Sequence, residues 1–179
     1  MAQRTAIDIF YEDASSVVGL LQAQAQISLQ VVAGDHFRKA LLLAVASHFE
    51  ERVCQIVLEF VRQKAPGSSL IENFIKNKAI ARQYHSWFDW EKPNANKFFA
   101  FFGSDFRQSM SSKVTASPLM QSSIRAFLEL GNERNKLVHQ NYVVFPMEKT
   151  MEEIYQLYKD ALPFVDGLLK ELLESEVAA

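Results

Sequence analysis

The stretch HFRKALLLAVASHFEERVCQIVLEFVRQK, residues 36–64, decides the fold class of this chain. Its apolar side chains recur at steps of three and four and so share one face of a helix of about eight turns; they are Leu42, Val45, Phe49, Val53, Ile56 and Phe60. Strand-like alternation is scarce elsewhere, and the 179 residues include only 6 Gly and 5 Pro. We therefore predict an all-α protein in which this helix packs within a bundle.

Helices are predicted on both sides of this stretch. The preceding helix covers roughly residues 6–32, with Gly34 and Asp35 as the expected stop and restart, and it should pair with the long helix as an antiparallel hairpin. After the long helix, Ser69 is the expected N-cap of a shorter helix, with Glu72 as its capping-box partner.

Two more helices are predicted towards the C-terminus. Ser117 is typical of an N-cap and Pro118 of a first helical position, so a helix should run from there to about residue 139. The last helix is expected over 150–174, where Pro163 should bend or interrupt it.

Residues 84–114 form the least regular part, with nine aromatic residues among the turn formers at 93–94 and 103–104. The simplest interpretation is an aromatic lid over one end of the bundle; stacking of RNA bases on these rings is the alternative. With this segment as an insert, we predict a single domain over residues 1–179. It would be an up-and-down bundle of four to five main helices with short accessory helices.

Composition excludes several classes of protein. A hydrophobic content of 49%, with 14 Phe, excludes disorder as a global description. The single Cys54 permits no intramolecular disulfide and no zinc cluster, and we expect it to be a small buried hydrophobe. No Gly-rich phosphate loop, metal-binding His pair or serine nucleophile elbow occurs, so we expect no metal and no cofactor. The charged N-terminus and the absence of a long apolar run predict a cytoplasmic protein without membrane spans.

Charge is distributed unevenly along the chain. The formal net charge is -2, but residues 62–139 hold 12 Lys and Arg against 6 Asp and Glu, a net of +6. The two ends together carry -8. This pattern is compatible with solvated helix faces of different sign and also with an RNA-binding centre, where acidic ends would serve a protein partner.

A polar amide interrupts the apolar stripe of the helix predicted over 118–139. Asn135 falls on the stripe, and Arg134 and His139 lie on its two shoulders, about 140° apart. The stripe itself consists of Met120, Ile124, Phe127, Leu128, Gly131 and Val138. Leu130 and Leu137 lie on a different face, which predicts a second packing partner for this helix.

The string GNERNKLVH, residues 131–139, resembles the signature of HEPN domains: an Arg, a polar residue that is often Asn, three more residues and a His. Those domains are bundles of four or five helices, and many are metal-independent endoribonucleases of toxin-antitoxin, abortive-infection and CRISPR systems. The resemblance extends loosely over most of the chain. The Phe49-Glu50 pair resembles the acidic position that many HEPN domains place opposite the Arg-His helix.

The resemblance implies a mechanism in which the ribose 2′-OH attacks the neighbouring phosphate of single-stranded or loop RNA. His139 would act as base or acid near neutral pH, and Arg134 would hold the phosphate through its planar fork. Asn135 would hold the scissile phosphate or orient His139. Glu50 would fix Arg134.

The resemblance also implies partners. One imidazole cannot easily be both base and acid, so a two-fold homodimer would supply a second His and a second Arg. An antitoxin or other defence-system protein would be a further partner. Besides Glu50, the residues expected to support the catalytic site are Glu133, Lys136 and Tyr142. Tyr142 departs from the pattern of toxins paired with nucleotidyltransferases, because Gln140 and Asn141 separate it from the histidine, and its modification is not expected.

Other interpretations stay open on the sequence. Arg134 would then be a helix-end residue paired with Glu50 or Glu129, and His139 a C-terminal cap. The protein would be a non-catalytic dimerisation or partner-binding module, or an antitoxin with an acidic C-terminal helix. The remaining histidines have no partner at catalytic spacing and are interpreted as structural or surface residues: His36, His48 and His85.

Overall fold

The computed structural model describes residues 4–174. Within this range the chain is all-α, as predicted, with eight α-helices, one π-helical segment and no strand. The elements are α1 (Ala6–Ala23), α2 (Ile27–Lys64), α3 (Ser69–Phe74), the π-helical η1 (Ile75–Ile80), α4 (Tyr84–Trp87), α5 (Asn96–Ala100), α6 (Ser104–Ala116), α7 (Pro118–His139) and α8 (Met151–Glu174).

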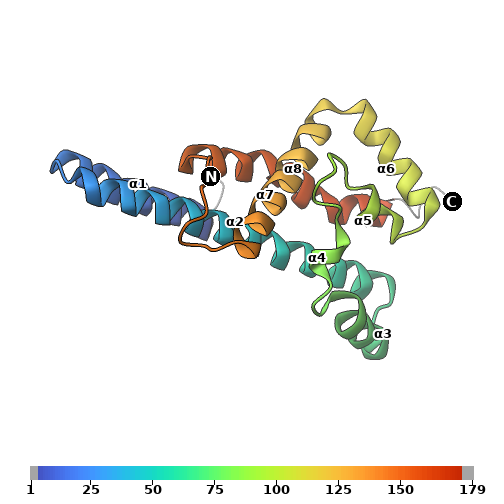
Figure 1. Cartoon of the computed structure of the whole chain (residues 1–179). Coiled ribbons are helices and arrows are strands. Elements are labelled where there is room, and N and C mark those ends of the chain that lie inside the picture. Colours follow the sequence, from blue (N-terminus) through green and yellow to red (C-terminus); the bar gives the residue numbers. More distant parts are fainter. Residues whose placement is uncertain (1–3, 175–179) are drawn as a thin grey trace.

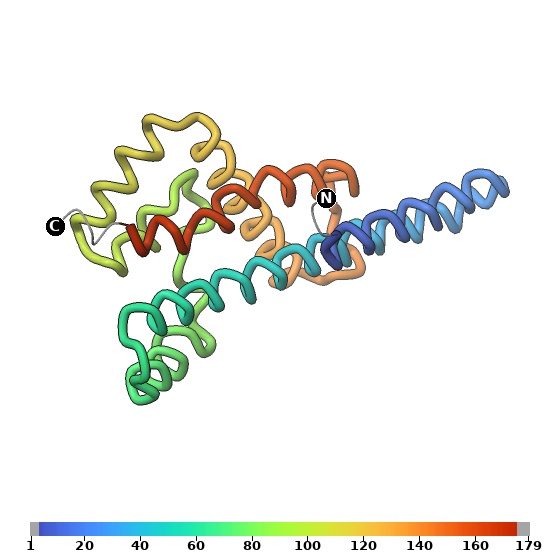
Figure 2. Tube along the Cα trace, turned by 180° about the vertical axis from the view of Figure 1, so that it is seen from behind, coloured from blue at the N-terminus to red at the C-terminus, as the bar shows by residue number. Residues whose placement is uncertain are grey.

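The long helices form an elongated bundle. The antiparallel hairpin of α1 and α2 projects from it as an arm, and the second half of α2 continues under the remaining helices (Figure 1). Both α7 and α8 pack on α2 and on each other, while α3 and η1 fold back against the end of α2 (Figure 2). The helix hairpin predicted from the sequence is thus confirmed.

The position of the hairpin turn was predicted wrongly. The chain turns at residues 24–26, where Ala25 adopts a left-handed φ of 55°, and α2 then runs unbroken through Gly34 and Asp35. Asp35 pairs with Arg38 and with Lys39, one turn further along the same helix. These pairs stabilise the helix where a glycine disfavours it by about 1 kcal/mol, so the helix continues.

The predicted cap of the short helix was also wrong. Ser68, not Ser69, precedes α3, and no side-chain hydrogen bond caps its first turn. Glu72 instead accepts a hydrogen bond from Arg62 Nε at 2.9 Å, which ties α3 to the end of α2. The ion pair between Glu72 and Arg62 of α2 therefore forms in place of the predicted capping box between Ser69 and Glu72.

The start of α7 is confirmed. Ser117 accepts a hydrogen bond from Met120 N at 3.2 Å, and Pro118 is the first helical residue. The start of α8 has its own capping box, in which Thr150 and Glu153 exchange backbone-to-side-chain hydrogen bonds of 2.8 and 3.1 Å.

Pro163 lies inside α8 without interrupting it. A proline in a helix interior lacks an amide donor and crowds the carbonyl four residues before it. The next amide, Phe164 N, donates to the fully buried Ser123 Oγ of α7 at 2.8 Å. A hydrogen bond between helices thus compensates for the local disturbance.

The aromatic stretch after residue 84 is mostly core. Two short helices and their loops hold its first part, whereas residues 104–116 form the regular helix α6. Because the rings are buried, they do not offer bases a stacking surface; they are Tyr84, Trp87, Phe88, Phe98, Phe99 and Phe106. Phe101 is an exception, with 56% of its surface exposed.

The second packing partner of α7 lies within the same chain. Leu130 and Leu137 are each only 1% exposed, because α7 packs against α2, α6 and α8. They are therefore not available as a dimer surface, because the packing partners of this face are other helices of the same chain. Val138, expected on the buried stripe, is 43% exposed.

A buried carboxylate joins the two ends of the chain. Asp8 of α1 accepts hydrogen bonds from Lys159 Nζ at 2.6 Å and Tyr155 Oη at 2.7 Å, both on α8, and from Thr5 N at 2.7 Å. Burial raises the pKa of this carboxyl, but the hydrogen bonds outweigh burial and hold its pKa well below the ordinary value. The charged form of Asp8 therefore stabilises the fold.

We predict that Asp8→Asn lowers the free energy of unfolding at pH 7 by about 1.5–3 kcal/mol, the range for hydrogen bonds to a charged group. Because the folded-state pKa is depressed, the contribution is complete above the unfolded pKa of about 4 and is lost as pH falls through the folded value. Urea unfolding at pH 7 and pH 3 measures this. Asp13→Asn, an exposed change on the same helix, is the control, and a deficit of equal size at both pH values would contradict the prediction.

Candidate active site

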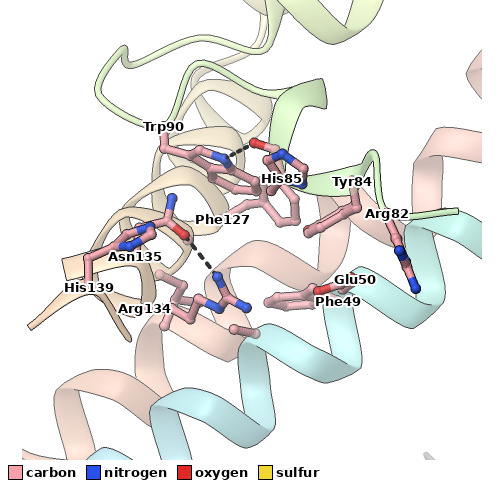
Figure 3. Close-up of a pocket in the computed structure, with 13 residues that line it drawn as sticks. Phe49, Glu50, Arg82, Tyr84, His85, Trp90, Phe127, Arg134, Asn135 and His139 are labelled. Carbon is pink, nitrogen blue, oxygen red and sulfur yellow. Dashed lines mark hydrogen bonds between the residues drawn. The ribbon is translucent and has the colours of Figure 1, made fainter. Parts of the chain in front are cut away.

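A cavity of about 420 Å³ opens between three parts of the chain: α2, residues 82–90 and the end of α7. Apolar rings lie beneath it and polar side chains surround it (Figure 3). The lining residues that matter for chemistry are Glu50, Arg82, Tyr84, His85, Trp90, Arg134, Asn135 and His139. The structure thus brings four sequence-predicted site residues to one cavity: Arg134, Asn135, His139 and Glu50.

The α7 wall carries the residues of the Arg-Asn-x3-His string. Arg134 Nη1 donates to Asn135 Oδ1 at 3.2 Å (Figure 3). Both side chains are half-buried, and His139, at the last position of the helix, is exposed. Since the amide oxygen accepts from Arg134, the Asn135 NH₂ group and most of the guanidinium donors stay available to a ligand.

The α2 wall contributes an unpaired carboxylate. Glu50 is exposed and makes no ion pair or hydrogen bond with the described residues, so the expected contact that would fix Arg134 is not made. Glu50 and Arg134 nevertheless both influence the pKa of the buried Tyr84 hydroxyl. Burial, then the Glu50 carboxylate, raises the pKa of Tyr84 well above its ordinary value, against a smaller opposing effect of Arg134. The Tyr84 hydroxyl is therefore protonated at neutral pH.

The third wall comes from residues 82–90. Trp90 Nε1 donates to the carbonyl oxygen of His85 at 2.9 Å, which closes the segment into a loop. The indole of Trp90 lies so close to Gly131 of α7 that a Cβ there would be 2.2 Å from its ring atoms. Arg82 has a left-handed φ of 61°. His85, interpreted from the sequence as a residue outside the site, lines the same cavity as His139.

A second hollow adjoins the first. It measures about 520 Å³, and both hollows are lined by Trp90, Asn135 and His139, so they meet at these residues. Lys97 and Lys136 belong to the second hollow. Lys136 Nζ is 2.8 Å from Glu133 Oε1. The two residues of α7 that were expected to support the site thus form an ion pair with each other.

Tyr142 lies apart from the cavity. Its ring packs near the imidazole of His36, with 6.3 Å between centroids, and under Lys39 Nζ at 5.4 Å. Lys39 is 1% exposed and pairs with Asp35 Oδ2 at 2.7 Å. Tyr142 therefore anchors the connection after α7 to α2.

Sequence reasoning missed Arg82, His85 and Trp90. Their proximity to α7 depends on a tryptophan that contacts a helix backbone about forty positions later, and helical periodicity carries no such information. One local signal was present: Gly131 lies in the middle of a helix, and a glycine there commonly marks a close approach of another group.

The described residues offer neither a metal-binding cluster nor a membrane-spanning helix. No group of three or more His, Cys, Asp or Glu side chains in residues 4–174 is arranged to hold a metal ion. None of the described helices has the length and apolarity needed to cross a bilayer.

Cys54 is half-buried, and burial together with Glu50 raises the pKa of its thiol to about 11.

We predict that Gly131→Ala destabilises the protein by about 1–3 kcal/mol, as overpacking does, because the new methyl group displaces Trp90. Gly167→Ala in α8 is the matched control: its Cβ meets nothing within 4 Å, so the higher helix propensity of alanine should stabilise the helix by about 0.5–1 kcal/mol. Thermal unfolding and tryptophan fluorescence measure both effects. Equal stabilisation by the two substitutions would contradict the packing argument.

Comparison with known proteins identifies the family. Residues 9–174 match the family described as RiboL-PSP-HEPN. No curated protein and no solved structure matches the chain. HEPN domains are helical bundles that typically bind RNA and dimerise, and they include ribonucleases of defence and toxin systems. The matched range takes in α2, the cavity and all of α7, which confirms the resemblance found in residues 131–139: the chain belongs to the RiboL-PSP-HEPN family.

Proposed function

We propose that this protein is a metal-independent endoribonuclease of a defence or toxin-antitoxin system that cleaves single-stranded or loop RNA. One observation carries the proposal: Arg134, Asn135 and His139 line one cavity, and residues 4–174 leave most of the hydrogen-bonding capacity of these side chains unused. At about 420 Å³ the cavity falls within the usual range for small-ligand sites, about 300–1,000 Å³.

The arrangement suits a phosphate held at the end of α7. The Arg134 guanidinium offers a planar pair of donors to two phosphate oxygens, and the Asn135 NH₂ group adds a third donor. These donors stabilise the charge that develops on the phosphorane. His139, exposed at the rim, is free to exchange a proton with the 2′-OH or with the leaving 5′ oxygen.

The two hollows provide a path for the RNA chain. They meet at Trp90, Asn135 and His139, so a phosphate placed there would have one nucleotide in each hollow. Lys97 and Lys136 would attract the backbone on the outer side, and binding should weaken with salt in proportion to the number of phosphates contacted.

A homodimer is part of the proposal. Two copies of α7 facing a common groove would supply a second imidazole and a second guanidinium to one RNA strand. Because Leu130 and Leu137 are buried within the protomer, such a dimer would use other surfaces. An antitoxin or another defence-system protein remains a proposed partner.

We predict that the purified protein cleaves unstructured RNA in EDTA to products with 2′,3′-cyclic phosphate and 5′-hydroxyl ends. His139→Ala should lower the cleavage rate by about 10²–10⁴-fold, the usual contribution of a positioned proton-transfer group. Arg134→Ala should lower it by about 10²–10³-fold, the usual loss when a donor to the charge that develops in the transition state is removed. Denaturing gel electrophoresis of a labelled oligonucleotide measures the rate. Cleavage that persists unchanged in both variants would refute the assignment.

Two control variants separate chemistry from folding. Arg52→Ala removes an arginine of α2 that contacts Asp166 at 4.0 Å, outside the cavity. His36→Ala removes an exposed histidine outside the cavity. Both should keep the wild-type rate, and thermal unfolding should show that all four variants are folded.

The exposed arm favours a second candidate, a non-catalytic module that binds a partner protein. Residues 14–34 contain no charged side chain, and several apolar residues at the tip are more than half exposed: Leu20, Ile27, Leu29, Val31 and Val32. Intact RNA, together with a complex or self-association that Leu20→Asp and Val31→Asp abolish, would support this candidate over the ribonuclease.

A further inference from the structure

Two polar groups in the cavity have no partner among residues 4–174. The Tyr84 side chain is buried, with 9% of its surface exposed, and its hydroxyl makes no hydrogen bond with the described residues. The described side-chain atoms that are both sealed from solvent and unpaired are Ser15 Oγ and Arg38 Nε, so the Tyr84 hydroxyl opens into the cavity that its ring lines. The second group is the carboxylate of Glu50, which lines the same cavity. Buried polar groups are nearly always paired, so an unpaired one in a cavity indicates a ligand.

Aromatic contacts hold both groups close to α7. The Tyr84 ring lies 5.7 Å from the ring of Trp90, which in turn lies 5.9 Å from the ring of Phe127 on α7. On the α2 wall, Glu50 follows Phe49, whose ring lies 5.6 Å from that of Phe127. The hydroxyl and the carboxylate are therefore carried by two walls that meet at one buried ring.

The two groups lie next to the proposed phosphate ligand. In Figure 3, His139 lies at one side of the cavity and Tyr84 and Glu50 at the other, with Arg134 between them. Burial is the largest cause of the raised pKa of Tyr84; Glu50 raises this pKa further, and Arg134 acts in the opposite direction. The hydroxyl is thus within electrostatic reach of both side chains. Because it stays protonated at neutral pH, it is available as a hydrogen-bond donor.

One donor and two acceptors in this part of the cavity match the base-pairing edge of guanine. On that edge the O6 carbonyl accepts, and N1–H and the N2 amino group are adjacent donors. Adenine, cytosine and uracil each have a single donor group on the same edge. Guanine alone can therefore give both oxygens of a carboxylate a hydrogen bond while its carbonyl accepts from a hydroxyl, and bonds to an ionised group are the stronger ones.

We infer that the cavity binds a guanine base, with Glu50 accepting from N1 and N2 and Tyr84 donating to O6. The inference rests on the proposed ribonuclease activity and specifies its substrate. A phosphate at the meeting of the two hollows places one nucleotide in this cavity, so the protein cuts RNA next to a guanosine. Single-stranded or loop RNA suits such a site, because its bases have free pairing edges.

The guanine pocket leaves the two-copy arrangement of α7 intact. Each protomer of a dimer would hold one guanosine in its own cavity, while the α7 residues of both copies act on the phosphate. Glu50 then serves the base instead of fixing Arg134, the role that the sequence led us to expect.

Nucleotide binding tests the pocket without any cleavage. In EDTA, guanosine monophosphate should bind the wild-type protein roughly 5–150-fold more tightly than inosine monophosphate, which lacks the N2 amino group, as expected for a bidentate base contact. Adenosine monophosphate should also bind more weakly than guanosine monophosphate. Isothermal titration calorimetry measures the affinities with the phosphate on the 3′ or the 5′ oxygen, and the tighter isomer shows which side of the cleaved bond the guanosine takes. Equal affinities for the guanosine and inosine nucleotides would overturn the inference.

Glu50→Gln should remove most of the preference for guanosine over inosine, because an amide offers only one acceptor oxygen. Glu51→Gln is the matched control. Glu51 is the next residue of α2, is exposed outside the cavity and accepts a hydrogen bond from Gln55 Nε2 at 3.0 Å, so this variant should keep the wild-type preference. An equal loss of affinity for all three nucleotides in Glu50→Gln would show that Glu50 acts through Arg134 and would contradict the assignment.

Tyr84→Phe removes the hydroxyl and keeps the ring. Inosine has the same O6 as guanosine, so the variant should bind both nucleotides about 2–10-fold more weakly, the loss expected for one neutral hydrogen bond, and their ratio should stay the same. The melting temperature should not fall, because the hydroxyl has no hydrogen bond to lose within residues 4–174. Unchanged affinity for both nucleotides would remove Tyr84 from the site.

Cleavage assays separate this inference from the proposed function. Oligonucleotides that differ in one base should be cut fastest beside a guanosine, and replacing that guanosine by inosine should slow cleavage. Cleavage without any base preference would overturn the guanine pocket and leave the proposed function standing. Selective binding of guanosine monophosphate by a protein that cuts no RNA would support the pocket and refute the proposed function.

Discussion

The aromatic contacts of Phe127 hold this protein together and also locate its cavity. The ring of Phe127 on α7 lies 5.6 Å from Phe49 of α2 and 5.3 Å from Phe164 of α8. It also lies 4.9 Å from Phe88 and 5.9 Å from Trp90 in the segment around α4. Four parts of the chain therefore meet at one side chain. Such buried rings contribute large apolar areas and favour edge-to-face geometries, which restrict how the helices can cross.

The position of the polar cavity wall on α7 follows from this packing. Phe127 fixes the rotation of the helix, and Gly131 lies one turn further on, where the indole of Trp90 covers the backbone. Another turn along are Arg134 and Asn135, at the level where the core ends and the cavity begins. The polar residues of the string thus project beyond the last buried ring of the same face. Their position depends on the aromatic contacts below them rather than on hydrogen bonds among themselves, of which one joins Arg134 to Asn135.

Local sequence signals predicted the elements well where local energetics decide. The apolar stripe from Leu42 to Phe60 and the Ser117 cap can each be recognised within one helix. The structure confirms both, on α2 and at the start of α7. The turn at residues 24–26 could not be predicted, because no glycine or proline marks it and pairing with α2 selects a left-handed Ala25. Leu130 and Leu137 were placed on a separate face correctly, yet periodicity does not say whether the partner of that face belongs to the same chain. His85 was missed for a related reason: its place in the cavity lining depends on the contact between Trp90 and Gly131, which no short window contains.

The cavity has an aromatic floor and a polar rim, and substitutions in these two parts affect the stability of the fold differently. Phe49 and Phe127 are each 2% exposed, so replacing them would leave a cavity in the crossing of α2 and α7 and destabilise the fold by several kcal/mol. Glu50, Arg82, His85 and His139 are exposed, and exposed substitutions away from special packing usually change stability by less than about 0.5 kcal/mol. Chemistry at the rim can therefore change, or be lost, while the bundle stays folded. An active nuclease and an inactive binding module are thus both compatible with this one scaffold, and the side chains at the rim decide between them.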